Sequence, residues 1–488
     1  MTAPRVRFAP SPTGFLHVGG LRTALYNFLF ARNMKGTFVL RIEDTDRTRL
    51  VEGAVENLTE TLRWAGLDFD EGPGVGGPYG PYIQSERTDL YRRYAEELIR
   101  TGKAYYAFDT PEELDAMRLE QQRMRIPPKY DRRALKLTPA EVEAKLAEGV
   151  PAVVRMKVPE STTVRFEDRI RGTVEFSSDR LDDQVLLKSD KFPTYHLANV
   201  VDDHLMGITH VIRGEEWVSS TPKHVLLYQF FGWELPEFAH LPLLLNPDKS
   251  KLSKRQGDVA VEDYRAKGIL REALINFVAL LGWNPGDERE LFSLEELTRE
   301  FSLDRVGKSG AVFNVEKLAW MNTQHTRRKP DEEILSLAAP SMLEAGLEEV
   351  APGYALNVIT LVKERMSVPS DLATAFKYFF TDPEQFSEQS RKKNWRPETS
   401  GNIEAVAEAL RDVDPFDEGA IERVVRETAE RLDVGAGKLI HPLRLCLSGE
   451  SVGPGLFEMM KVLGKETCLR RINRGVRILS EESLASNG

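Results

Sequence analysis

Cysteine is nearly absent from this chain: among its 488 residues only Cys446 and Cys468 occur. Their spacing matches no metal-ligand pattern and gives little prospect of a disulfide framework, so a reducing compartment is the simplest setting. Long apolar runs are also lacking. The longest, such as 277–283, are far too short to span a bilayer, and residues 1–7 show no apolar signal-peptide core. We therefore expect a cytoplasmic protein.

The composition is that of a globular protein, with 41% hydrophobic and 29% charged residues, and the length allows several domains. The formal net charge of -10 argues against indiscriminate binding of nucleic acid. Basic residues nevertheless gather at 123–133, 391–393 and 461–477. Each cluster could be a solvated helix face, but together they leave room for a structured RNA partner.

Strand and helix signals alternate along the first part of the chain, give way to charged helices and β-rich segments over roughly 84–194, and then resume. From about 325 onward nearly every signal is helical. The economical interpretation is an α/β sheet split by an insertion and followed by an all-α region. The expected elements include strands at 6–9, 38–42, 194–201 and 210–213, a helix at 55–64 and a loop at 72–81.

The most informative segment is 11–20, where small residues and one histidine separate an apolar strand from a helix with an apolar stripe. Such a turn lets a ligand approach the backbone and aims free N–H groups at an anion such as a phosphate. A lone histidine there is most often structural, but its small neighbours favour binding. The candidate residues are Thr13, Gly14, His17, Gly19 and Gly20.

A second cationic motif lies far downstream at 251–255, in a loop bounded by turn-forming residues. Lys251, Ser253, Lys254 and Arg255 could belong to a solvated loop, yet this density of cations is unusual for a passive one. A lysine can follow a triphosphate as a mobile point charge while it becomes pyrophosphate. The two motifs predict a nucleotide held between a helix N-terminus and a cationic loop.

Charged side chains in strand-like segments indicate a ligand crevice. Arg7 and Arg41 lie in apolar runs, where a charge is costly unless it is paired. The carboxylates at 43–46 follow the second run, and they could form a salt-bridged loop or accept hydrogen bonds from an amino group of a ligand.

Two further strands are expected to bring polar residues to the same edge of the sheet. Tyr195, His196 and Asn199 would lie on one strand or its edge, and Arg213 would end another. Open α/β sheets bind ligands at the carboxyl ends of their strands. Each residue alone is ambiguous, but the set predicts one crevice.

The segments 7–14 (RFAPSPTG) and 17–20 (HVGG) resemble the HIGH region of bacterial glutamyl-tRNA synthetases, a class I family, and 251–255 (KLSKR) resembles their KMSKS loop. The resemblance extends over the whole chain. Further similar segments are 41–46, 80–87, 186–190, 193–204 and 213–217.

The resemblance implies ATP-dependent attachment of L-glutamate to the 3′-terminal adenosine of glutamate tRNA through a glutamyl-adenylate, with Mg2+ entering as the ATP complex. It also implies a monomer that serves protein synthesis. Because the attacking carboxylate is already a nucleophile, catalysis would rest on positioning and charge neutralisation. Proximity of this kind can supply roughly 7–11 kcal/mol of the barrier reduction.

Carried over by position, the resemblance implies a role for each candidate. Arg7 would bind the side-chain carboxylate of glutamate, with Tyr195 nearby; glutamine would leave that guanidinium buried and unpaired, at a cost on the order of 2–5 kcal/mol. The other implied assignments are catalysis for His17, Lys251 and Lys254; ATP binding for Thr13, Gly14, His17, Gly19, Gly20, Lys251, Ser253, Lys254 and Arg255; the α-amino group of glutamate for Ser11 and Glu43; its α-carboxylate for Arg213 and Asn199; and an anticodon base for Arg365.

The chain departs from the family pattern in a few places. Gly20 stands where many class I enzymes carry a second histidine, and Leu252 and Arg255 replace Met and Ser of the KMSKS loop while Lys254 is kept. Some relatives bind zinc through cysteines in the insertion. The segment 104–110 has none, so we expect no zinc.

The implied fold is a Rossmann-type α/β catalytic domain split by an α/β insertion and followed by an all-α C-terminal anticodon-binding region. The helical end separates the chain from glutaminyl-tRNA synthetases, whose anticodon-binding part is a β-barrel. The expected boundaries are 1–83 and 195–248 for the catalytic halves, 84–194 for the tRNA acceptor-binding insertion, 249–325 for a stem-contact region with the KLSKR loop, and 326–378 and 379–488 for two anticodon-binding subdomains.

Two other functions stay open at this point. A small-molecule nucleotidyltransferase would share the histidine turn but would not need the helical region after 325. A catalytically inactive RNA-binding protein would have no need of Arg7, His17, Glu43 and Lys254. The sequence also leaves open whether glutamine tRNA is charged.

Overall fold

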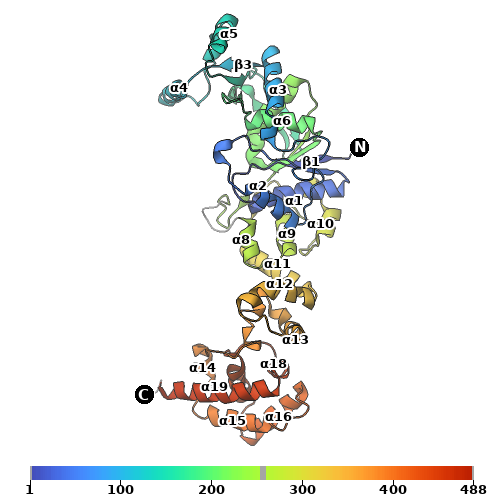
Figure 1. Cartoon of the computed structure of the whole chain (residues 1–488), viewed down its shortest axis with the longest axis vertical. Coiled ribbons are helices and arrows are strands. Elements are labelled where there is room, and N and C mark those ends of the chain that lie inside the picture. The colour runs from blue at the N-terminus through green and yellow to red at the C-terminus, as the bar shows by residue number, and fades with distance from the viewer. Residues whose placement is uncertain (1–2, 253–259, 486–488) are drawn as a thin grey trace. The chain divides into compact units, whose positions relative to one another are not determined.

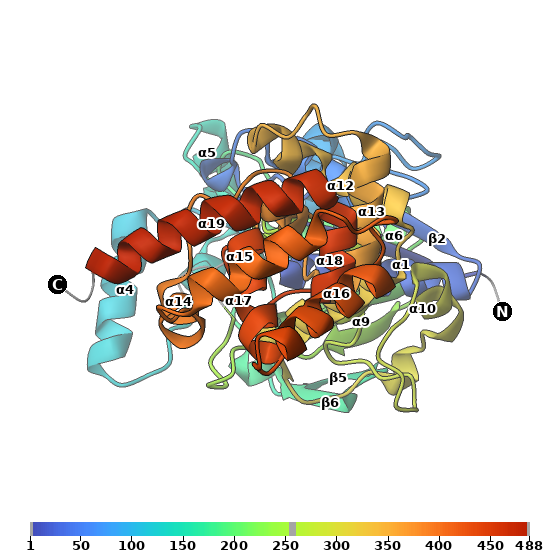
Figure 2. The ribbon, with the colours of Figure 1, turned by 90° about the horizontal axis from the view of Figure 1, so that it is seen from below.

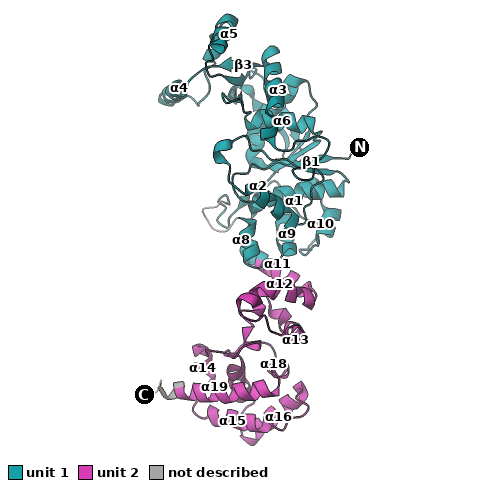
Figure 3. Cartoon of the chain, viewed as in Figure 1, with its two compact units in different colours: residues 1–318 teal, residues 319–488 magenta. Residues whose placement is uncertain are grey.

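The computed structural model describes residues 3–252 and 260–485, the last four of these by backbone alone. The chain divides into two compact units, 1–318 and 319–488, each with its own hydrophobic core (Figure 3). Among the described residues, no helix combines the length and the apolar character needed to cross a membrane.

Unit 1 combines strands and helices, whereas the described part of unit 2 is helical, as the sequence pattern predicted. The strands are β1 (Arg5–Phe8), β2 (Thr37–Leu40), β3 (Ala104–Ala107), β4 (Val153–Met156), β5 (Thr163–Asp168), β6 (Gly172–Ser177), β7 (Val185–Leu187), β8 (His210–Gly214), β9 (Glu237–Leu241), β10 (Leu244–Leu245) and β11 (Ala311–Val312). The helices up to the boundary are α1 (Val18–Asn33), α2 (Ala54–Trp64), α3 (Thr88–Arg100), α4 (Pro111–Arg123), α5 (Pro139–Ala147), α6 (Tyr195–Leu205), α7 (Thr221–Phe231), α8 (Val261–Ala266), α9 (Arg271–Ala279), α10 (Leu294–Glu300) and α11 (Val315–Arg328). Those of unit 2 are α12 (Asp331–Glu344), α13 (Pro352–Val362), α14 (Glu388–Asn394), α15 (Thr399–Leu410), α16 (Glu418–Arg431), α17 (Gly437–Ser448), α18 (Leu456–Leu463) and α19 (Lys465–Ala485).

Parallel strands with crossover helices form the centre of unit 1 (Figure 1). β1 pairs with β2 across α1, and β8 pairs with β9 across α7. The backbone N–H of Thr209 donates to the carbonyl oxygen of Arg5 at 2.9 Å, so the two strand pairs lie side by side. Their carboxyl ends therefore open on one edge, where such sheets bind ligands.

The segment 84–194, which the sequence predicted to be an insertion, contributes to two sheets. β3, β4 and β7 form an antiparallel sheet of their own, beside which α4 and α5 lie (Figure 1). The hairpin of β5 and β6 instead joins β9, where Asp168 pairs with Phe238 in a parallel register. This hairpin brings Asp168 next to the central strands.

α1 is buried on more of its surface than the apolar stripe in its sequence suggests. Leu21, Leu25 and Leu29 of that stripe are fully buried, and so are Ala24 and Tyr26 beside them. Helices α9 and α10 cover α1 on the side away from the strands (Figure 1). The helix that begins at the phosphate-type turn is therefore held rigidly.

The segment 195–205 is a helix, α6, and the strand predicted at 194–201 is wrong. Short apolar runs such as this one fit a buried strand and a buried helix equally well, and a preceding proline does not decide between them. The helix has a consequence for the site. Tyr195, Asn199 and Asp203 are spaced four residues apart, which places them on one helix face.

Unit 2 is built around a helical core in which α19 lies across α15, α17 and α18 (Figure 2). Gly475 allows the close approach of α19 to α17, because a Cβ at that position would lie 2.7 Å from Sγ of Cys446. Cys446 and Cys468 are both buried and form no disulfide. The two cysteines therefore serve the packing of this core.

Candidate active site

A cavity of about 520 Å3 opens at the carboxyl ends of β1 and β8 and brings together most of the residues that the sequence singled out. Ser253, Lys254 and Arg255 lie outside the described residues, and Arg365 lies in unit 2. The predicted residues that line the cavity are Arg7, Ser11, Thr13, Gly14, His17, Gly19, Gly20, Glu43, Tyr195, Asn199, Arg213 and Lys251.

The turn after β1 ends in a histidine cap on α1. Nδ1 of His17 accepts a hydrogen bond of 3.0 Å from the backbone N–H of Gly20. Since Nδ1 is an acceptor, a neutral imidazole carries its hydrogen on Nε2. Gly19 and Gly20 belong to the first turn of the helix, and a Cβ on Gly19 would lie 3.1 Å from the imidazole, so residue 19 must stay small to leave the ring in place.

The chain around the KLSKR motif returns to this turn. Lys251, the first residue of the motif, is exposed and lines the cavity, and Ala260, which follows the motif, pairs with His17 in a backbone bridge. The backbone N–H of Val261 also donates to the carbonyl oxygen of Leu16 at 2.9 Å. The described residues on both sides of the segment 253–259 therefore lie next to the turn after β1.

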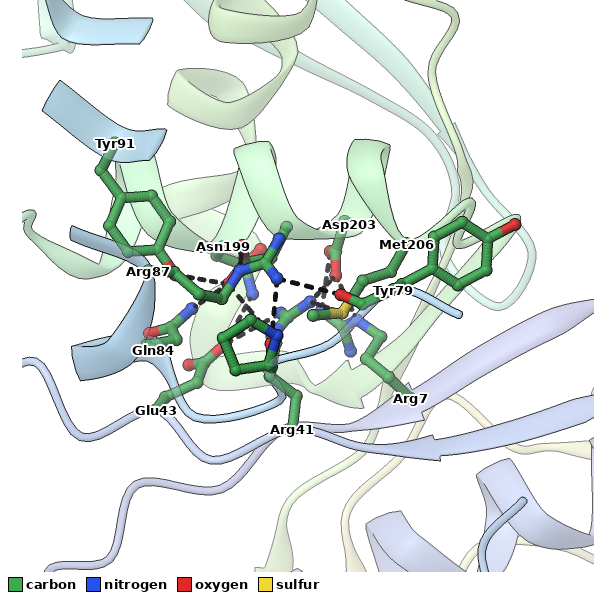
Figure 4. A network of polar contacts seen from close by, with 12 residues as sticks. Arg7, Arg41, Glu43, Tyr79, Gln84, Arg87, Tyr91, Asn199, Asp203 and Met206 are labelled. Carbon is green, nitrogen blue, oxygen red and sulfur yellow. Dashed lines mark hydrogen bonds and ion pairs between the residues drawn. The ribbon is translucent and has the colours of Figure 1, made fainter. Parts of the chain in front are cut away.

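A network of buried ion pairs holds the cavity residues Arg7 and Glu43 in place (Figure 4). Arg7 donates to both carboxylate oxygens of Asp203, at 2.9 and 3.1 Å, and Arg41 donates to the same group at 2.7 Å. Burial alone would raise the pKa of Asp203, but the two guanidinium groups hold the pKa below its usual value. Asp203 is therefore an anion that joins two arginines.

Glu43 occupies the other side of Arg41. Its Oε1 accepts from Nη2 of Arg41 at 2.9 Å and from the side-chain amide of Asn199 at 3.1 Å. Burial raises the pKa of Glu43 and Arg41 opposes that rise. A cationic group of a ligand next to Glu43 would lower its pKa further, and the ionised carboxylate would bind that group.

Asp202 anchors α6 to the segment before α3. Its carboxylate accepts from Nε of Arg87 at 2.8 Å, from the amide of Gln84 at 2.9 Å and from the hydroxyl of Tyr91 at 2.8 Å. These residues, like Asp203, were assigned no role from the sequence. Their signal was a pair of adjacent acids in an apolar run, where a charge must find a partner.

Arg213 ends β8, as predicted, and is only 5% exposed. Among the described residues no carboxylate lies within 4.0 Å of its guanidinium. All of its acceptors are neutral groups: Nε2 of His240 at 3.1 Å, the hydroxyl of Tyr195 at 2.9 Å, Nδ1 of His224 at 3.3 Å and Oγ1 of Thr221 at 2.8 Å.

The two arginines proposed to bind glutamate, Arg7 and Arg213, therefore differ. Arg7 is neutralised by Asp203 before any ligand enters, so the argument that glutamine would leave it unpaired does not hold for this residue. Its Nη1 has no hydrogen-bond partner among the described residues and Arg7 lines the cavity, so a donor remains for a ligand. In the described part of the chain Arg213 has no acidic partner, and neither has Arg22, a third arginine of the cavity wall, which donates to backbone carbonyl oxygens.

No group of three or more histidine, cysteine, aspartate or glutamate side chains in the described part of the chain is placed to hold a metal ion. The cavity therefore presents guanidinium groups, backbone N–H groups, the buried carboxylate of Glu43, the exposed carboxylate of Glu216 and an exposed lysine. This set suits a ligand that carries several negative charges and one amino group.

Comparison with known proteins agrees with this chemistry. Residues 4–320 match the catalytic domain of class I tRNA synthetases (E and Q), and 333–476 match an anticodon-binding domain. The glutamate-tRNA ligase of Chloroherpeton thalassium is 54% identical over 97% of both chains, and that of Pelodictyon phaeoclathratiforme is 53% identical over 96% of this chain and 97% of the relative. A crystal structure of a glutamate tRNA ligase from Elizabethkingia meningosepticum in complex with its amino acid is 44% identical, covers 98% of this chain and 100% of that one, and superimposes with a TM-score of 0.93. The predicted family and fold class are confirmed, and the chain belongs to the glutamate-tRNA ligases of the class I tRNA synthetases.

Proposed function

We propose that this chain attaches L-glutamate to the 3′-terminal adenosine of glutamate tRNA through a glutamyl-adenylate intermediate. One observation carries the proposal: a single cavity holds both the histidine-capped helix N-terminus and two unequal arginines, Arg7 and Arg213, on the neighbouring strands β1 and β8. The first suits a nucleotide phosphate, and the second suits an amino acid with two carboxylates.

The glutamate subsite lies between β1 and α6. Arg7 offers Nη1 to the side-chain carboxylate, and Arg213 offers an unpaired positive charge to the α-carboxylate. Glu43 and Ser11 receive the α-amino group. Asn199 donates its amide to Glu43, which suggests that it orients this carboxylate in addition to any contact with the substrate.

The nucleotide subsite lies at the start of α1. Thr13, Gly14, Gly19 and Gly20 leave the backbone accessible to the phosphates, and Nε2 of His17 donates a hydrogen bond to them. Lys251, with Ser253, Lys254 and Arg255 of the same motif, neutralises the triphosphate. Mg2+ enters as part of the ATP complex, and no zinc is required.

The reaction needs no covalent enzyme intermediate. A carboxylate oxygen of glutamate attacks the α-phosphorus of ATP, the bond from that phosphorus to the bridging oxygen breaks, and pyrophosphate leaves. The terminal ribose hydroxyl of the tRNA, first the 2′-hydroxyl, then attacks the acyl carbon and releases AMP. Because charge builds up on phosphate oxygens in the first step, fixed cations and N–H groups lower its barrier.

Both units are proposed to contact the tRNA. The region 84–194 would hold the acceptor end, and unit 2 would hold the anticodon, where bases of single-stranded loops are read by arginines and aromatic rings. Arg365 is exposed. Burial raises the pKa of Tyr378, and the charges of Arg444 and Arg365 oppose that rise, so both arginines lie near this ring. Neither arginine has a carboxylate within 4.0 Å among the described residues. The expected subdomain boundaries, the monomeric state and the cytoplasmic location stay predictions.

ATP–pyrophosphate exchange with glutamate, in the presence and absence of glutamate tRNA, tests the proposed function. We expect exchange that requires glutamate and the tRNA together. Exchange supported by another small acid without any RNA would favour a nucleotidyltransferase. No exchange under any condition, with retained tRNA binding, would favour an inactive RNA-binding protein.

A further inference from the structure

Arg213 and His240 face each other across two adjacent parallel strands. The register of β8 and β9 pairs the two residues directly, and Nε of Arg213 lies 3.1 Å from Nε2 of His240. Both side chains are buried, and His240 has no exposed surface. The sheet itself therefore fixes this contact.

The direction of the hydrogen bond follows from the chemistry of the two groups. A guanidinium can only donate, so Nε2 of His240 must accept and the ring hydrogen must sit on Nδ1. Nδ1 lies 2.6 Å from Oδ2 of Asp168 at the end of β5. Burial lowers the pKa of His240, which keeps the ring neutral as this arrangement requires.

Asp168 is a buried anion whose oxygens are fully engaged. Oδ1 accepts from the backbone N–H groups of Ile170 and Arg171 at 3.0 and 2.8 Å, and Oδ2 accepts from the backbone N–H of His240 at 3.2 Å. Burial would raise the pKa of Asp168, but the hydrogen bonds from His240 and the backbone hold the pKa below its usual value. Its charge stabilises the cation of Arg213 from the far side of the imidazole.

We propose that His240 and Asp168 are positioning residues for Arg213, with the imidazole acting as a neutral spacer. A carboxylate in direct contact would neutralise Arg213, as Asp203 neutralises Arg7. The spacer instead orients the guanidinium and leaves its charge for a carboxylate of the substrate. This inference rests on the proposed binding of glutamate in the same cavity.

The other contacts of Arg213 follow the same rule. His224 of α7 accepts from Nη1 through Nδ1, and its Nε2 lies 3.1 Å from Nδ1 of His196. The pKa of His224 is well below its usual value, first because of burial and then because of Arg213, so this acceptor is neutral too. One N–H of Nη2 has no acceptor among the described residues. The guanidinium is thus held on several edges by groups that carry no charge.

The matched variants H240Q and H240E test the spacer. A glutamine can present its carbonyl oxygen near the position of Nε2, and a glutamate of the same shape presents a carboxylate there. In aminoacylation of glutamate tRNA we expect H240Q to keep the KM for glutamate within about threefold of the wild type, since a neutral acceptor remains. We expect H240E and the apolar H240L to raise that KM roughly 10- to 100-fold, with the KM values for ATP and tRNA unchanged.

Two competitive inhibitors show which substrate group the spacer serves. Glutamol replaces the α-carboxylate by a hydroxymethyl group, and glutamine replaces the side-chain carboxylate by an amide. If Arg213 binds the α-carboxylate, H240L weakens inhibition by glutamine but leaves inhibition by glutamol unchanged. The reverse pattern would keep the spacer and reassign Arg213 to the side-chain carboxylate.

The spacer role is contradicted if H240E and H240Q have the same KM for glutamate. It is also contradicted if H240L raises the KM values for glutamate and for ATP by the same factor. Thermal unfolding of all three variants separates loss of folding from loss of positioning. If the wild-type enzyme charges no glutamate, the proposed function is contradicted. That outcome is distinct from failure of the spacer, which is read from the variants of an active enzyme.

Discussion

Arg7 donates to both carboxylate oxygens of Asp203, so a residue expected to meet the substrate as a bare cation is already half of a buried ion pair. Both side chains are nearly inaccessible to solvent. The pair gives Arg7 a fixed orientation, and its Nη1 has no hydrogen-bond partner among the described residues. Arg213, in contrast, keeps an uncompensated charge, which is available to the α-carboxylate of the substrate.

The ion pair predicts different effects on stability for the two arginines. Arg7→Met leaves Asp203 with one cationic partner fewer in a buried site, and breaking such a pair costs about 3–5 kcal/mol of unfolding free energy. Arg213→Met removes a cation whose contacts are all neutral, and we expect a clearly smaller loss. Urea unfolding of both variants measures the difference, and equal losses would contradict the contrast drawn between the two sites. Both variants should lose glutamate activation.

Two substitutions of His17, the N-cap of α1, distinguish its effect on stability from its effect on catalysis. His17→Asn keeps a good N-cap residue but removes the Nε2 donor, whereas His17→Ala removes both. We expect the alanine variant to lose about 1 kcal/mol of stability and the asparagine variant to lose little. Both should lower kcat about 10²- to 10³-fold, as expected for loss of a donor to the reacting phosphate. A normal kcat for His17→Asn would limit His17 to a structural cap.

Buried histidines make stability depend on pH. Burial, with Lys223 and Arg213 nearby, lowers the pKa of His196 to about 3, while a histidine in the unfolded chain titrates near pH 6.5. Below pH 6.5 the unfolded state therefore binds a proton that the folded state does not, and stability falls as the pH falls. The loss is about 2 kcal/mol for this residue between pH 6.5 and 5.

The variant His196→Gln should remove that part of the pH dependence. Urea unfolding at pH 6.5 and pH 5 gives the difference for the wild type and for the variant. His441→Gln, at an exposed position in unit 2, is the matched control. An unchanged difference in His196→Gln would show that His196 is protonated in the folded protein as well.

Replacement of Arg365 in unit 2 is expected to affect tRNA binding alone. Arg365→Ala should raise the KM for glutamate tRNA about tenfold, since a base contact of this kind is worth roughly 1–3 kcal/mol. The KM for glutamate and for ATP should stay as in the wild type. Arg423→Ala, an exposed arginine of α16, serves as the control. An equal effect of both variants would point to general charge attraction in place of base reading.

Much of the site could be predicted because a charged side chain in an apolar segment destabilises the fold unless it meets a partner or a ligand. Arg7 and Arg213 in apolar runs, and a histidine beside small residues, each indicate a ligand or a partner through their neighbours in the chain alone. Arg213 does lie at the carboxyl end of a strand, and Lys251 of the second motif does line the same cavity as the first motif. The resemblance to a family placed these residues in one reaction.

The errors have a common physical cause. Local pattern does not distinguish a buried helix from a buried strand over such a short run, so Tyr195 and Asn199 were assigned to a strand. The partners of Arg7 and Arg213 come from segments far away in the chain, such as Asp203 and His240. No spacing rule connects them, because tertiary packing alone brings α6 and β9 to these arginines.

The most direct test of the account is the charging of glutamate tRNA by the purified chain with ATP and labelled glutamate, followed by the same assay with glutamine and aspartate. We predict a base-labile ester of glutamate on the terminal adenosine, with glutamine and aspartate charged far less well, and we predict that Arg213→Met abolishes it. Full activity of Arg213→Met would contradict the claim that an uncompensated buried arginine binds the α-carboxylate, and efficient charging of glutamine would contradict the proposed binding of the side-chain carboxylate by Nη1 of Arg7.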